Sequence, residues 1–107
     1  SDFPVEIVDP QWGVYAALTR QDAQGYPAGG WHPDQRMSLE ETLRAFTAGA
    51  AYASFAENRL GVLKPGLRAD VTVFDRDLFN VPPADVLASK IRYTIIDGGV
   101  AYEASQP

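Results

Sequence analysis

The chain has 107 residues, of which 46% are hydrophobic and 21% charged, and nine basic against fourteen acidic side chains give a net charge of −5. This composition predicts one folded domain, excludes intrinsic disorder, and argues against nucleic acid or an anionic membrane surface as a partner. The sequence contains no cysteine, which excludes disulfides and thiolate metal sites. No apolar run approaches the ~20 residues of a membrane span. We therefore expect a soluble protein, and a cytoplasmic one.

The first half of the chain has the spacing of helices. Asp9 is suited to cap a helix and Pro10 to occupy its first position, so the sequence predicts a helix over residues 10–18. The side of this helix that we expect to be apolar carries Trp12, Tyr15 and Ala16.

Residues 19–37 contain three glycines and two prolines without an apolar period, which predicts a long loop that lines a site or covers a surface. His32, the one histidine of the chain, lies in this loop. We interpret it as a loop residue, with a contact to substrate left open, because a hydrolytic zinc site usually needs three protein ligands.

A second helix is expected from Ser38, because Ser38 and Glu41 form a capping box in which each side chain can bind the backbone N–H of the other residue. Gly49 is expected to bend or divide this helix before Phe55. The residues that recur at helical spacing along it are Leu39, Leu43, Phe46 and Ala50.

From Gly61 onward the pattern changes to strands. Pro65 and Gly66 suit a type II turn, residues 71–74 suit a strand, Pro83 can start one or two helical turns, and residues 91–102 suit a hairpin with Asp97, Gly98 and Gly99 at its tip. One sheet face would carry Val71, Val73, Ile91, Tyr93, Ile95, Val100 and Tyr102. The fold class predicted is α+β, with two or three helices followed by a small, mainly antiparallel sheet.

The order of these blocks resembles the C-terminal end of the amidohydrolase superfamily. The resemblance is carried by "GVLKPGLRADVTVFDRD" and "IRYTIIDGGVAYE", and upstream by "SDFPVE", "DPQWGVYAALTR" and "GWHPDQRMSLEETLRAFTAGAAYASF", which are similar to the branch that contains N-substituted formamide deformylases. It implies that residues 1–58 form the end of a (β/α)8 barrel and that residues 61–107 form the C-terminal part of a β-sandwich. The chain would then be a fragment of a longer enzyme.

The resemblance also implies a role for Asp2. It matches the family's aspartate at the end of the eighth barrel strand, which binds a divalent metal, expected to be zinc, and moves a proton from the attacking water to the leaving amine. The parent would then hydrolyse carbon–nitrogen bonds other than peptide bonds, of the amide or formamide type. The isolated chain is expected to bind no metal and to be inactive. The alternatives are a turn carboxylate at Asp2 and a non-catalytic binding or structural module.

The other acidic and aromatic side chains have structural interpretations. Asp70 and Asp75 bracket a strand and are expected to bind turn backbone groups. Trp12, Tyr15 and Trp31 are interpreted as core or packing residues and not as a platform for substrate. The expected partners are the remainder of the parent barrel, or further copies of the chain, and a small amide substrate.

Overall fold

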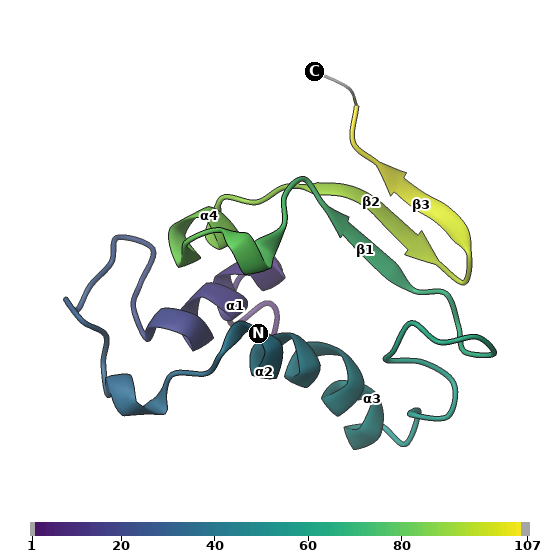
Figure 1. The fold of residues 1–107 in the computed structure, drawn as a ribbon, viewed down its shortest axis with the longest axis horizontal. Helices are drawn as coiled ribbons and strands as arrows, with labels where there is room; N and C mark the ends of the chain where they lie inside the picture. Colours follow the sequence, from purple (N-terminus) through teal and green to yellow (C-terminus); the bar gives the residue numbers. More distant parts are fainter. Residues whose placement is uncertain (1, 106–107) are drawn as a thin grey trace. The chain divides into compact units, whose positions relative to one another are not determined.

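A computed structural model describes residues 2–105 of the chain. The fold is α+β, as expected, and the helical turns predicted from Pro83 are confirmed in the chain between the first two strands of the sheet (Figure 1). In chain order the elements are α1 (Pro10–Thr19), a 3-10 turn (Pro33–Gln35), α2 (Leu39–Arg44), a π-helical segment (Ala45–Gly49), α3 (Ala50–Ala53), β1 (Val71–Phe74), a 3-10 turn (Leu78–Asn80), α4 (Pro83–Leu87), β2 (Ile91–Ile96) and β3 (Gly99–Glu103).

The chain forms two compact units. The first contains residues 2–43 and Asp77–Ser89, and the second contains Arg44–Arg76 and residues 90–105. Each unit therefore includes residues from both of the ranges, 1–58 and 61–107, into which the sequence was divided. The assignment of those ranges to a barrel and a sandwich stays a prediction.

Helix α1 begins and ends as its sequence dictates. The Asp9 carboxylate accepts a hydrogen bond from the Gln11 N–H at 3.1 Å, and Pro10 occupies the first turn. Arg20 ends the helix in the left-handed conformation, with φ of 58°, and donates its N–H to the carbonyl of Ala16 at 2.8 Å. The predicted helix is confirmed and is one residue longer than expected.

The core of the first unit lies where α1 packs against α4 (Figure 1). Val14, Tyr15, Leu78 and Val86 are buried there, and Val86 is only 1% exposed. Burial of a side chain of this size contributes about 1.5–3 kcal/mol. The buried Gln11 side chain donates to the carbonyl of Ser89 at 3.2 Å, so the polar group in this core is satisfied.

The apolar side expected for α1 is only partly correct. Tyr15 is buried, but Trp12 is 46% exposed and Ala16 is exposed. The buried positions of this helix are Gln11, Val14, Tyr15 and Thr19, so the face that meets α4 is centred on Val14 and Tyr15.

The helical stretch that follows the loop starts with the predicted capping box. The Ser38 N–H donates to Glu41 Oε2 at 2.8 Å, and the Glu41 N–H donates to Ser38 Oγ at 3.2 Å. The Ser38 hydroxyl also donates to Glu41 Oε2 at 2.9 Å. The two bonds that the Glu41 carboxylate accepts, first from the Ser38 N–H and then from the Ser38 hydroxyl, lower the pKa of Glu41. The irregularity expected at Gly49 is present as the π-helical segment, after which α3 continues. Phe46 is 47% exposed, whereas Thr42 and Ala51 are the residues of this stretch that are buried.

The second unit contains an antiparallel sheet in the order β1-β2-β3. The Pro65-Gly66 turn is confirmed, because Gly66 has φ of 90° and the Leu67 N–H donates to the carbonyl of Lys64 at 3.1 Å. At the hairpin tip Asp97 and Gly98 have φ of 51° and 80°, the positive values that a type I′ turn requires.

The registers of the sheet correct two predicted positions. Ile91 was expected on the face of Val71 and Val73, but a register shift pairs it with Phe74, which lies on the other face.

The second correction lies in the hairpin. Val100 pairs with Ile95, so both lie on the face that was expected for them. Tyr102 pairs with Thr94, which was not expected on that face. A register shift between Thr94 and Ile95 places an extra residue in β3, and because side chains alternate along a strand, Tyr102 moves to the other face.

Candidate functional site

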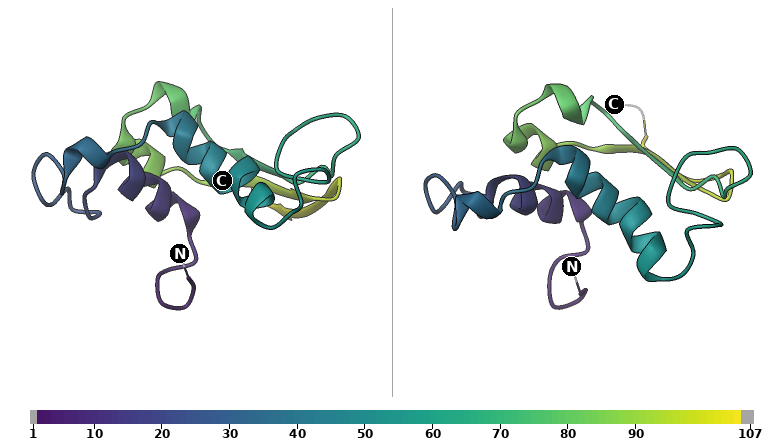
Figure 2. Two further views of the ribbon diagram at one scale, coloured as in Figure 1. Left: turned by 90° about the horizontal axis from the view of Figure 1, so that it is seen from below. Right: turned by 60° about the horizontal axis from the view of Figure 1, so that its bottom comes forward.

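Asp2 lies in a turn before α1. Its backbone has φ of 53° and its carbonyl accepts a hydrogen bond from the Val5 N–H at 2.8 Å. The residue is exposed, and within residues 2–105 no donor is hydrogen-bonded to its carboxylate. Figure 2 shows the segment before α1 as a loop that leads away from the helix. The structure therefore presents an accessible carboxylate, and the catalytic and metal-binding roles of Asp2 stay predictions.

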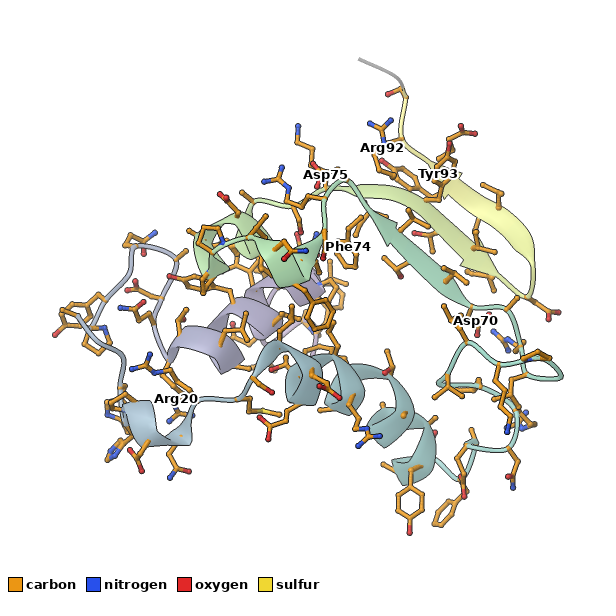
Figure 3. All side chains as sticks on the ribbon, in the orientation of Figure 1. Arg20, Asp70, Phe74, Asp75, Arg92 and Tyr93 are labelled. Atoms are coloured by element: carbon orange, nitrogen blue, oxygen red, sulfur yellow. The ribbon has the colours of Figure 1, made fainter. Side chains whose placement is uncertain are left out.

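The acids that bracket β1 bind backbone groups, as expected (Figure 3). Asp70 Oδ1 accepts from the Asp97 N–H at 2.9 Å, and Asp70 Oδ2 lies 2.9 Å from the guanidinium Nε of Arg68. The Asp97 N–H and the Arg68 side chain hold the pKa of Asp70 below its usual range. Asp70 thus ties the start of β1 to the tip of the hairpin.

His32 is an exposed loop residue, as expected. Its ring lies edge-on to that of Trp31, with 4.4 Å between the centroids, and its backbone is left-handed with φ of 47°. Among residues 2–105 no group of three or more His, Cys, Asp or Glu side chains is placed to hold a metal ion. Since a hydrolytic zinc site usually takes three protein ligands, these residues do not fit a complete metal centre.

The loop after α1 is closed by contacts between Arg20 and Trp31. The Trp31 N–H donates to the carbonyl of Arg20 at 2.9 Å, and Arg20 Nε donates to the carbonyl of Trp31 at 3.0 Å. The Arg20 guanidinium also lies 4.9 Å from the centre of the Trp31 ring. Trp31 is 62% exposed and therefore lies outside the core, but it packs against Arg20 and His32.

Sequence reasoning singled out neither Arg20 nor its link to Trp31. The signal available in the sequence was Gly30, which has φ of 89° and whose Cβ, if it had one, would collide with the carbonyl oxygen of Thr19. A glycine at such a point marks a close approach of two backbone segments.

Within the described part of the chain, no helix is long and apolar enough to cross a membrane.

The fold is shared with a solved enzyme. The structure matches an amidohydrolase from Thermotoga maritima with a TM-score of 0.60 at 23% sequence identity, over 96% of this chain and 22% of that one. At this identity the match shows the fold alone.

The sequence then identifies the family. The sequence model described as "Amidohydrolase family" matches residues 1–102, so the chain belongs to the amidohydrolase family. YtcJ of Bacillus subtilis, named as an amidohydrolase, is 30% identical over 98% of this chain and 20% of its own length. The N-substituted formamide deformylase of Arthrobacter pascens is 29% identical over 96% of this chain and 18% of its own length. The chain thus spans about a fifth of the length of the curated relatives it matches.

Proposed function

We propose that this chain is part of a longer hydrolase that cleaves carbon–nitrogen bonds other than peptide bonds, with an amide or N-substituted formamide as substrate. The observation that supports this most directly is the family match over residues 1–102, which begins at the segment that holds Asp2. A relative named N-substituted formamide deformylase, similar over 96% of this chain, supports the formamide class.

In this proposal Asp2 is the acid–base residue. An ionised carboxylate can accept a proton from the water that attacks the carbonyl carbon and can then donate that proton to the departing amine nitrogen. Asp2 is exposed in the structure, and no donor within residues 2–105 occupies its carboxylate, which leaves it accessible for such transfers. The carbonyl of Asp2 is held by the Val5 N–H, which fixes the backbone of the turn.

The remaining groups of the site belong outside this chain. A divalent metal, zinc in this proposal, would need its further ligands from elsewhere in the longer protein, because residues 2–105 hold no cluster of three candidate ligands. The isolated chain is therefore proposed to be inactive. The alternative function is a non-catalytic binding or structural module.

The test uses the full-length protein encoded by the reading frame that contains this sequence, with the 107-residue chain as its control. Each is incubated with N-methylformamide and N-benzylformamide, with added zinc, and formate release is measured. We expect formate from the full-length protein and none above the blank from the short chain. A full-length protein without turnover would favour the non-catalytic module. Zinc-dependent turnover that rises with the concentration of the short chain would overturn its proposed inactivity.

A further inference from the structure

The loop between α1 and the first 3-10 turn holds its shape through its own contacts. Gln21 Nε2 donates to the carbonyls of Gly25 at 2.8 Å and Pro27 at 3.0 Å, and Asp22 Oδ1 accepts from the Tyr26 N–H at 2.9 Å. Together with the contacts between Arg20 and Trp31, these bonds close residues 20–31 into a compact surface loop of the kind that is frequently functional.

This closed loop exposes aromatic side chains instead of burying them. Tyr26 is 72% exposed and Trp31 is 62% exposed, while the Arg20 guanidinium and the edge-on ring of His32 contact the Trp31 indole. The left-handed backbone of His32 adds strain, which proteins keep mainly where it serves a function. An immobilised, accessible indole binds an apolar ligand at low entropic cost, because its rotamer is already chosen.

The place of the loop in the chain points to a ligand. If Asp2 ends the last strand of the proposed barrel and α2 is the barrel helix that follows it, the chain between them contains α1 and residues 20–31 and is far longer than the ordinary βα connection of ~2–6 residues. The βα connections of barrel enzymes build the active-site face. We infer that Trp31 is a specificity-determining residue that contacts the N-substituent of the amide substrate, an inference that rests on the proposed function.

The order of Asp2, α1 and Trp31 along the chain bears on which part of the substrate Trp31 would contact. Asp2 precedes this helix and Trp31 follows it, and a helix of ten residues is about 15 Å long. Trp31 is therefore assigned to the end of the substrate that is remote from the scissile bond. Contacts to a remote group stabilise the bound substrate and the transition state alike, so their loss raises KM and leaves kcat nearly unchanged.

The experiment compares Trp31→Ala with Phe55→Ala in the full-length protein. Phe55 is a matched control because it is an aromatic residue that is 91% exposed on a different segment. The substrates are N-methylformamide, N-benzylformamide and N-(4-phenylbenzyl)formamide. For N-(4-phenylbenzyl)formamide, the one substrate long enough to reach a remote contact, we expect Trp31→Ala to raise KM at least ~10-fold. The KM values of the two shorter substrates, and kcat for all three, should stay within ~3-fold of the wild-type values. Trp31→Phe keeps an aromatic ring and should restore most of the KM, which loss of loop structure alone would not explain.

The outcomes separate this inference from the proposed function. If the wild-type protein releases formate but Trp31→Ala matches Phe55→Ala on all three substrates, the role of Trp31 is overturned and the proposed function stands. If the wild-type protein hydrolyses none of them, both fall. Trp31→Leu, which keeps an apolar side chain without a ring, gives the same comparison if the alanine variant does not fold.

Discussion

Asp75 and Lys90 bind each other in both directions at the point where β1 ends. The Asp75 N–H donates to the carbonyl of Lys90 at 2.9 Å, and the Lys90 N–H donates to Asp75 Oδ1 at 3.0 Å. The carboxylate also accepts from Arg76 Nε and Nη2, each at 2.9 Å. One backbone bond and the Asp75 carboxylate thus continue the β1–β2 ladder beyond its last paired residues, Phe74 and Ile91 (Figure 3).

This arrangement predicts loss of stability in acid. Arg76 and the Lys90 N–H hold the pKa of Asp75 well below its ordinary value, so the stabilisation is complete above pH ~5 and is lost as the pH falls through and below the ordinary aspartate pKa of ~3.9. We expect the melting temperature to fall between pH 5 and 2, and to fall less for Asp75→Asn, which no longer titrates. The exposed Asp34→Asn serves as control. Parallel curves for Asp75→Asn and the unchanged chain would refute this role.

Gly61 is predicted to tolerate no side chain. Its φ is 101°, and an added Cβ would lie 2.6 Å from the Cβ of Ala51, which is 2% exposed. Gly66 has a similar φ of 90° but nothing within 4 Å of the added atom. Gly66→Ala should therefore cost about 1–2 kcal/mol of unfolding free energy, from the backbone alone, and Gly61→Ala at least ~1 kcal/mol more. Urea unfolding measures both, and equal costs would contradict the predicted collision.

The sheet of the second unit predicts association of the short chain. β1 and β3 are edge strands, every residue of β3 is exposed, and β3 carries no charge before Glu103. Such an edge pairs readily with another strand, either from the rest of the longer protein or from a second copy. Sedimentation should show an average mass that rises with protein concentration. Val100→Lys, on β3, should reduce this association more than the control Gln24→Lys, which adds the same charge outside the sheet. A dilution-insensitive monomer would show that the edge needs no partner.

Local signals in the sequence predicted the elements whose causes are local. Asp9, the Ser38–Glu41 capping box and the Pro65-Gly66 turn each act within a few residues, and the structure confirms all three. The acids Asp70 and Asp75 were correctly assigned to backbone groups, although the sequence could not show which groups.

Features that depend on distant segments were not predictable in this way. The register shift that moves Tyr102 to the face of Thr94 arises from the pairing of β2 with β3, and the apolar pattern of either strand alone does not contain it. The exposure of Trp31 goes with the closure of a loop by Arg20. Arg20 is polar and lies outside any apolar pattern, so no periodicity in the sequence indicated this contact. The alternation of the chain between two units likewise depends on which segments pack together.

The central claim, that this chain supplies the acid–base carboxylate of a carbon–nitrogen hydrolase, is tested most directly at Asp2. The measurement is kcat for N-benzylformamide in the full-length protein carrying Asp2→Asn, with Glu6→Gln, an exposed acid of the same segment, as the matched control. Because an amide cannot accept the proton, we expect Asp2→Asn to lower kcat at least ~10²-fold with an unchanged circular dichroism spectrum, and Glu6→Gln to stay near the wild-type rate. An Asp2→Asn variant within a few-fold of the wild-type kcat would contradict the claim and leave Asp2 a turn carboxylate.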